Sequence, residues 1–173
     1  DDKMDFKQFI RNIPDFPKQG ILFRDITTLL KDPKSFNYAL DELYNSIINK
    51  NITKVVAIES RGFIFGSLLA NKLNAGFVPI RKPNKLPAEK IAEEYALEYG
   101  TDKIEIHKDA ITSSDNILLH DDLLATGGTM LAACKLVEKL GGKISQISFL
   151  IELEALNGRN LLKDYNVTSI IKY

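Results

Sequence analysis

Three short apolar runs along this chain have the length of buried β-strands. They are Val55–Ile58, Phe77–Ile80 and Ile117–Leu119, and no charged residue interrupts them. Runs of this kind, apolar on both faces, are typical of strands in a parallel sheet that helices cover. Pro79 lies inside the second run and removes one backbone donor, so this strand is less typical than the other two.

Apolar residues recur at helical spacing in the segments around these runs. We expect helices over 33–49, up to about Leu73 after the first strand, and from Met130 to the stop signal Gly141-Gly142. Strands that alternate with helices predict an α/β fold with a mostly parallel central sheet flanked by helices.

The two ends of the chain carry weaker signals. Residues 3–13 are predicted to form an amphipathic helix that Pro14 and Pro17 end. Residues 15–26 are rich in Pro and Gly yet apolar, which indicates a loop that covers either the core or a flat ligand. At the other end we expect a strand, a short helix and a final edge strand, over 144–153, 154–163 and 167–171.

Residues 86–108 are polar and predict a β-hairpin. Two alternating runs, Tyr95–Tyr99 and Lys103–His107, flank Gly100-Thr101-Asp102. We expect this hairpin to make few core contacts, so that it can open and close over a site.

Composition narrows the class of protein. The 173 residues favour a single domain, and 45% hydrophobic with 27% charged residues is a soluble globular balance. Lys+Arg and Asp+Glu both number 23, so no net charge attracts nucleic acid or an anionic membrane. The only cysteine, Cys134, excludes an internal disulfide, and no segment reads as a membrane span or signal peptide. We therefore expect a cytoplasmic protein.

The candidate chemistry centres on residues 117–129. Asp121 and Asp122 follow an apolar run and precede the turn Ala125–Thr129, where a helix begins. Free backbone N–H groups at a helix N-terminus suit a phosphate, whereas the carboxylates suit ribose hydroxyls or a ligand-borne Mg²⁺. A phosphate site beside an acid pair indicates a phosphorylated sugar.

Two further strand ends carry cations. Glu59-Ser60-Arg61-Gly62-Phe63 is a second strand-to-helix turn, and Arg81, Lys82 and Lys85 follow the strand that ends at Ile80. The first is a second candidate anion site. A short charge run such as the second is more often a solvated face. For Glu59 we favour a role in orienting its loop through backbone N–H groups.

A set of separated motifs resembles the type I phosphoribosyltransferase family, in the form that acts on adenine. They are FPxxGIxFxDI, ESRGF, RKxxKLP, YxLEYG, DDLLATGGT and LIELEALNGRNxL, in this order from about Ile10 to Gly158. The resemblance implies transfer of the phosphoribosyl group of phosphoribosyl pyrophosphate (PRPP) to N9 of adenine, giving AMP and pyrophosphate. It also implies an N-terminal hood over about 1–30, a flexible lid over about 86–108, and a homodimer.

The resemblance assigns roles by motif. Glu98 is implied to do acid–base work on the purine, and Mg²⁺ is carried on PRPP rather than held by the protein alone, with Asp121 as a candidate contact to the ion through water. The remaining implied roles are 5′-phosphate and ribose binding by Asp121, Asp122, Ala125, Thr126, Gly127, Gly128 and Thr129, pyrophosphate binding by Ser60, Arg61, Arg81, Lys82, Lys85 and Tyr99, and adenine binding by Leu22, Phe23, Arg24 and Leu153.

Three residues depart from the family pattern, and alternatives remain open. Asn84 replaces a usual Gly, Gln19 replaces a common Pro, and His120 occupies an apolar position, where we expect an exposed rim histidine. His120 could instead titrate near neutral pH and perturb Asp121. The other readings are a phosphoribosyltransferase for hypoxanthine or xanthine, a PRPP-sensing regulator without catalysis, and a purely structural domain.

Overall fold

The computed structural model describes residues 3–97 and 99–173. Within the chain two compact units are distinguished, residues 1–42 and 43–173. The predicted hood belongs to the first unit, and the predicted lid and the DDLLATGGT turn belong to the second.

The first unit is built on a small antiparallel pair of strands. It contains η1 (Phe6–Phe9), β1 (Arg11–Pro14), β2 (Leu22–Asp25), α1 (Thr27–Leu30) and the start of α2 (Pro33–Asn45). The predicted helix over 3–13 is therefore wrong except for a short 3₁₀ helix at Phe6–Phe9, and 15–26 is partly strand. Pairing of β1 with β2 from Arg11↔Asp25 to Pro14↔Leu22 overrides the local periodicity, and Arg11 anchors it with two hydrogen bonds to Asp25 at 2.9 and 2.8 Å.

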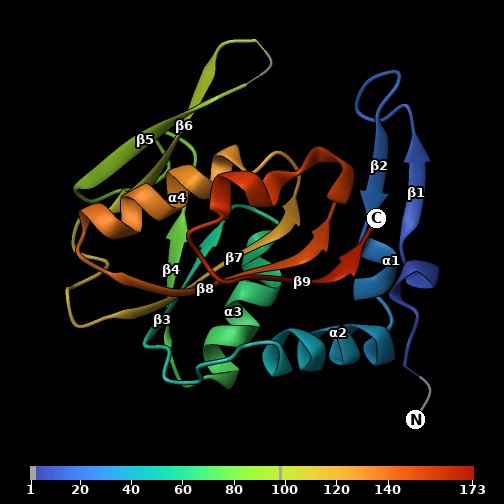
Figure 1. The fold of residues 1–173 in the computed structure, drawn as a ribbon, viewed down its shortest axis with the longest axis horizontal. Coiled ribbons are helices and arrows are strands. Elements are labelled where there is room, and N and C mark those ends of the chain that lie inside the picture. Colours follow the sequence, from blue (N-terminus) through green and yellow to red (C-terminus); the bar gives the residue numbers. More distant parts are fainter. Residues whose placement is uncertain (1–2, 98) are drawn as a thin grey trace. The chain divides into compact units, whose positions relative to one another are not determined.

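The second unit contains the predicted parallel sheet. Its five strands run in the order β4 (Gly76–Ile80), β3 (Lys54–Ile58), β7 (Asn116–Leu124), β8 (Lys143–Glu152) and β9 (Val167–Lys172), and every neighbouring pair is parallel. The expected edge position of β9 is confirmed. Pro79 is tolerated because β4 is the other edge. In Figure 1, α3 (Gly62–Lys72) lies on one face of the sheet and α4 (Gly128–Lys139) on the other.

The predicted helix over 154–163 is replaced by two 3₁₀ turns. They are η2 (Glu154–Leu156) and η3 (Gly158–Leu162), and they meet at Asn157, which has φ 52° and ψ 37°. A residue in this left-handed conformation cannot continue a right-handed helix. α2 likewise ends at Asn45, four residues before the predicted end.

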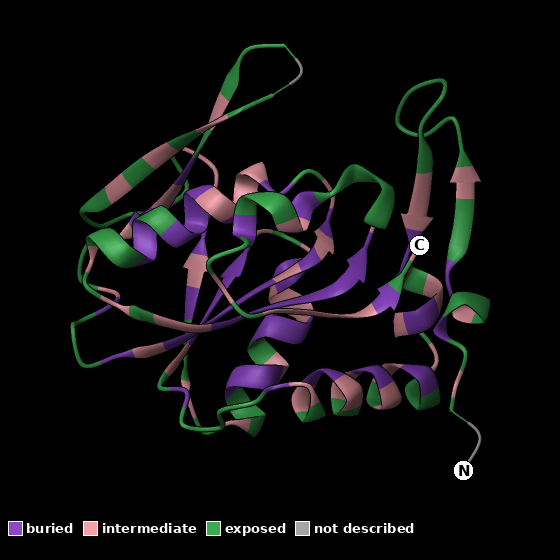
Figure 2. Cartoon of the chain, viewed as in Figure 1, coloured by how far each residue is buried: buried purple, intermediate pink, exposed green. Residues whose placement is uncertain are grey.

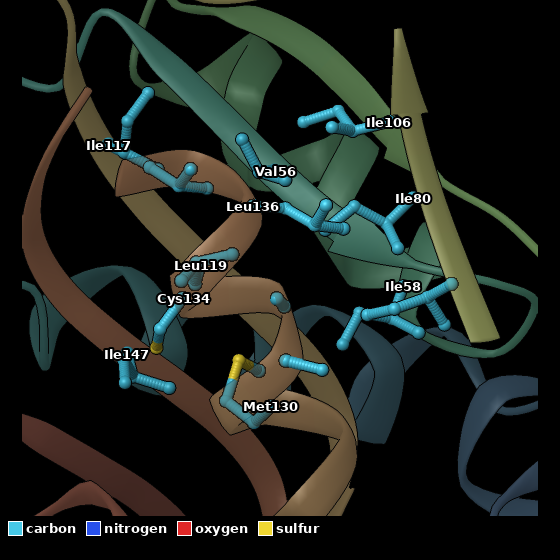
Figure 3. Close-up of a cluster of buried hydrophobic side chains, with 14 of the residues drawn as sticks. Val56, Ile58, Ile80, Ile106, Ile117, Leu119, Met130, Cys134, Leu136 and Ile147 are labelled. Atoms are coloured by element: carbon cyan, nitrogen blue, oxygen red, sulfur yellow. The ribbon is translucent and has the colours of Figure 1, made fainter. Parts of the chain in front are cut away.

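The core lies between the sheet, α4 and one strand of the hairpin. Figure 3 shows Met130, Cys134 and Leu136 of α4 among side chains from β3, β7 and β8. The three inner strands of the sheet, β3, β7 and β8, are largely buried in Figure 2. The hairpin consists of β5 (Lys90–Ala96) and β6 (Thr101–His107), and Ile104 and Ile106 are completely buried in this core. The expectation that the hairpin makes few core contacts is therefore wrong for β6.

Candidate active site

The turn between β7 and α4 forms a small cavity at the carboxyl end of the sheet. Gly127 is the N-cap of α4 and has φ 92°, a left-handed conformation that glycine adopts at little cost. The first backbone hydrogen bond of the helix runs from the Leu131 N–H to the Gly127 carbonyl. The N–H groups of the residues before Leu131 in this turn therefore lack partners within the helix. The cavity measures about 80 Å³, enough for a phosphate group, and is lined by Asp121, Leu123–Met130 and Phe149.

The two adjacent carboxylates have different surroundings. The Asp121 side chain lines the cavity, and its Oδ1 accepts the Asp122 N–H at 2.8 Å. Burial raises the pKa of Asp121 well above its usual value, and the charge of Asp122 raises it further. Asp122 is buried and forms an ion pair with the Arg61 Nε at 2.8 Å. Only Asp121 therefore lies in the cavity, while Asp122 holds a neighbouring loop.

That neighbouring loop joins β3 to α3 and touches the end of β7. Arg61 is the N-cap of α3. A Cβ placed on Gly62 would lie 3.0 Å from the Asp121 Oδ1 and 3.4 Å from its Cα, so a larger residue would push the loop away. The two sequence-predicted anion sites are therefore adjacent, because β3 and β7 are neighbours in the sheet.

Glu59 contacts the segment with cationic side chains that follows β4. Its side chain is 9% exposed and accepts the Lys82 N–H and the Lys85 Nζ, each at 2.6 Å. The Arg81 Nε lies 3.4 Å from the same carboxylate. Burial favours a higher pKa for Glu59, but the Lys85 ammonium and the Lys82 N–H outweigh it and the pKa is lowered. Glu59 thus orients a loop through a backbone N–H, but this is the loop after β4 and not its own loop between β3 and α3.

Lys82 is turned toward the hairpin instead. Its Nζ donates to the Tyr95 hydroxyl and to the Asp102 Oδ2, the latter at 2.7 Å, and lies 5.1 Å from the centre of the Tyr95 ring. Burial lowers the pKa of Lys82, but the hydrogen bonds to Asp102 and Tyr95 raise it by more. Lys82 therefore stays charged and ties the loop after β4 to the hairpin.

The other predicted site residues have a less direct relation to the cavity. Glu98 lies outside the described residues, and Tyr99 beside it is 88% exposed. Leu153 is half-buried, and its N–H donates to the Leu124 carbonyl at 3.0 Å, which puts it next to the turn. Leu22, Phe23 and Arg24 lie on β2 in the first unit, so their predicted contact with adenine stays a prediction.

His120 is not an exposed rim residue, and that expectation is wrong. It is completely buried on β7, which continues five residues beyond the predicted end at Leu119. Its Nδ1 lies 3.2 Å from the Ser148 hydroxyl, and its Nε2 has no hydrogen-bond partner in the described part of the chain. Burial lowers its pKa to about 4, so His120 is neutral at physiological pH.

Sequence reasoning missed Gly158 as a neighbour of the turn. A Cβ on Gly127 would lie 2.7 Å from the Gly158 carbonyl oxygen, and a Cβ on Gly158 would lie 2.5 Å from the Ala125 carbonyl oxygen. The two backbones therefore pack directly on each other. The Asn-Gly pair at 157–158 is a turn signal that could have been noticed, but nothing local reveals what the turn contacts.

Comparison with known proteins defines the family to which this chain belongs. The sequence model of the phosphoribosyl transferase domain family matches residues 27–172, and the chain belongs to this family. The resemblance seen in the motifs is thereby confirmed.

Within the family the chain is similar to adenine phosphoribosyltransferases. It is 56% identical to the enzyme of Koribacter versatilis, over 96% of this chain and 92% of that one, and 54% identical to that of Methanococcus vannielii, over 98% of each. The solved adenine phosphoribosyltransferase of Thermoanaerobacter pseudethanolicus has a TM-score of 0.94 and 53% identity, covering 97% and 98% of the two chains. The Saccharomyces cerevisiae structure, solved with an imino-altritol bisphosphate and adenine, has a TM-score of 0.88 and 39% identity, covering 95% of each chain.

The described residues carry neither a candidate membrane helix nor a metal-ligating cluster. Within 3–97 and 99–173, no helix has the length and apolar character that spanning a bilayer requires. The same residues contain no group of three or more His, Cys, Asp or Glu side chains that could hold a metal ion.

Proposed function

We propose that this protein joins adenine to the phosphoribosyl group of PRPP, giving AMP and pyrophosphate in purine salvage. The observation that carries the proposal is the phosphate-sized cavity at the β7–α4 turn, with Asp121 in its wall and a cationic loop beside it. The relatives that share more than half of their residues with this chain over almost its full length are named for the same activity.

The turn and Asp121 are the proposed holders of the phosphoribosyl group. Backbone N–H groups of Ala125–Thr129 and the N-terminus of α4 attract the 5′-phosphate. The Asp121 carboxylate accepts hydrogen bonds from the ribose hydroxyls. These contacts fix C1 of the ribose relative to the two groups that exchange there, which lowers the entropic part of the barrier.

The leaving pyrophosphate is proposed to bind at Ser60, Arg61, Arg81, Lys82, Lys85 and Tyr99. In the free protein Arg61 pairs with Asp122, and Arg81 and Lys85 pair with Glu59. These three cationic side chains are 36–44% exposed, so a ligand can reach them while their carboxylate partners keep them in place. Positive charge held here stabilises the negative charge that grows on pyrophosphate as the C1–O bond breaks.

Adenine is proposed to bind at Leu22, Phe23, Arg24 and Leu153. The flat base would stack on Phe23, because an aromatic face binds a purine without charge. Glu98 is the proposed acid–base group for protons on the purine as the N9–C1 bond forms. Both assignments rest on the FPxxGIxFxDI and YxLEYG motifs.

Magnesium is proposed to arrive with PRPP. The described residues hold no metal-ligating cluster, and among them Asp121 is the one acid that lines the cavity, so its carboxylate fits a contact to the ion through water. Bound to the diphosphate, Mg²⁺ would neutralise part of the charge of the leaving group. By the same family resemblance we propose a cytoplasmic homodimer.

The proposal is tested by measuring pyrophosphate release from PRPP with each purine in turn. Adenine is expected to support release with formation of AMP, and hypoxanthine, xanthine and guanine are expected to support far less. Pyrophosphate release that requires hypoxanthine would show that hypoxanthine, and not adenine, is the substrate base. Binding of PRPP without turnover with any purine would indicate a regulator.

A further inference from the structure

A second network of charged residues lies behind the phosphate turn and outside the proposed contacts with substrate. It consists of Glu152, Arg159 and Ser169, called here the Glu152 clamp. Arg159 donates to Glu152 from Nε at 3.0 and 2.9 Å and from Nη2 at 2.9 Å, and its Nη1 donates to the Val167 carbonyl at 2.8 Å. The Ser169 hydroxyl donates to the same carboxylate at 2.6 Å.

Burial and hydrogen-bond geometry make the clamp rigid. Glu152 is buried at the end of β8, and the two-point fork of Arg159 fixes orientation as well as distance. The Arg159 guanidinium lowers the pKa of Glu152, so the carboxylate is charged at neutral pH. Because Val167 and Ser169 belong to the first half of β9, the clamp joins the end of β8 and the first half of β9 to η3.

Gly158 connects the clamp to the phosphate turn. It precedes Arg159 directly, and a Cβ there would lie 2.5 Å from the Ala125 carbonyl oxygen and 2.7 Å from the Leu124 Cδ1. Gly127, whose left-handed backbone starts α4, touches the Gly158 carbonyl in the same way. The backbone of residue 158 therefore forms the rear support of the turn, and Arg159 fixes where that support lies.

We infer that Glu152 and Arg159 are positioning residues for the phosphate turn and act on it through Gly158. The inference rests on the proposed function, because it presumes that the turn holds a sugar phosphate. If the clamp loosens, residue 158 shifts against Ala125 and Gly127, and the backbone N–H groups no longer converge on one anion. The proposed pyrophosphate loops follow β3 and β4, which lie on the far side of β7 from the clamp in the sheet order, and should be unaffected.

The test is titration calorimetry of the full chain with two ligands, ribose 5-phosphate for the turn and inorganic pyrophosphate for the loops. Arg159→Met and Gly158→Ala are expected to weaken ribose 5-phosphate binding roughly tenfold or more, since small displacements of positioned groups cost this much. Arg159→Lys keeps the charge and loses the fork, so it should fall between wild type and Arg159→Met. Pyrophosphate affinity should stay within about twofold.

Lys163→Met is the matched control, because Lys163 is an exposed cation just after η3. Unchanged ribose 5-phosphate affinity in Gly158→Ala and Arg159→Lys overturns the inference, and so does equal loss of both ligands, which would mark general damage. If Arg159→Met does not fold, Arg159→Lys decides the question. A wild-type protein that binds neither ligand would contradict the proposed function and the clamp together, whereas normal wild-type binding with unaffected variants contradicts the clamp alone.

Discussion

The two acids at the end of β7 show how neighbouring residues of one type acquire different roles. Asp121 is half-buried in the cavity wall and has a raised pKa, whereas Asp122 is buried and paired with Arg61. A carboxyl group with a raised pKa favours the folded state only while protonated, so its contribution is present below its unfolded pKa and is lost as pH rises through the folded value. Above the unfolded pKa, and so at neutral pH, Asp121 therefore destabilises the free protein.

We accordingly expect opposite effects of two similar substitutions. Asp121→Asn should raise the free energy of unfolding by on the order of 1 kcal/mol while PRPP affinity falls, a common trade between stability and function. Asp122→Asn should lower the free energy of unfolding, because Arg61 loses its partner. Urea unfolding at pH 7 and PRPP titration of both variants check this. Stabilisation by Asp122→Asn, or destabilisation by Asp121→Asn, would contradict the assignment.

His120 should make the protein sensitive to acid. Its pKa is about 4 in the fold and 6.5 for an unperturbed side chain, so stability is present above pH 6.5 and is lost as pH falls toward 4. Between pH 7 and pH 5 the loss should be about 2 kcal/mol. Chemical unfolding of His120→Leu at both values should show less of this loss than wild type.

His107→Gln is the control for that measurement. His107 is the other histidine of the chain, is only half-buried, and accepts the Ala88 N–H at 3.3 Å. The same acid sensitivity in wild type and His120→Leu would show that another group titrates.

Glu98 is assigned from its motif, and kinetics can test it without structural detail. Glu98→Ala should lower kcat roughly 100-fold or more, the usual size of an acid–base contribution, and change the Kd for PRPP little. The exposed Glu94 on β5 provides a matched control through Glu94→Ala. If kcat is preserved in Glu98→Ala, the acid–base role belongs elsewhere.

The β5–β6 hairpin is both a core element and a surface ribbon. Ile104 and Ile106 of β6 are buried, whereas Leu97 and Tyr99 near its tip are exposed. Lys82 binds Asp102 and Tyr95, so the loop after β4 is connected to the hairpin close to that tip. Any lid motion should therefore be confined to the tip and should depend on Lys82.

Asp102→Asn should loosen the tip. Removing the carboxylate takes away the charged partner of Lys82. Amide hydrogen exchange should therefore accelerate at the end of β5 and the start of β6, while the amides of Ile104 and Ile106 stay protected. Glu94→Gln removes the partner of Lys103 in a more exposed pair, 3.6 Å apart, and should have little effect. Equal exchange in Asp102→Asn and wild type would show that Lys82 does not restrain the hairpin.

The buried strands of the sheet could be predicted from the sequence, whereas segments whose conformation depends on distant partners could not. The runs at 55–58, 77–80 and 117–119 all became strands of the parallel sheet, because continuous apolar residues at that length have few other solutions. The helix over 3–13 failed because β1 gains its partner from β2, which no window around residue 10 contains. The helix over 154–163 failed at Asn157, whose left-handed conformation depends on its surroundings.

For the whole molecule, the motifs could indicate which residues to propose for the site, but not which of them are in contact. The strand ends at β3 and β7 meet, as the close approach of Gly62 to Asp121 shows. Contacts between elements far apart in the chain give Asp121 and Asp122 their different roles and pair Glu59 with Lys85. Contacts of the same kind bring the backbone of Gly158 against the turn. Sequence spacing carries no information about such contacts until the sheet order is known.

We propose that one edge of this sheet holds the sugar phosphate and the pyrophosphate side by side. A crystal structure of the full chain grown with AMP and pyrophosphate tests this arrangement. We expect the 5′-phosphate of AMP at the backbone N–H groups of Ala125–Thr129, the ribose hydroxyls at Asp121, and pyrophosphate at Arg61 and Lys85. A phosphate of AMP bound away from the turn, or pyrophosphate bound away from both cationic loops, would contradict it.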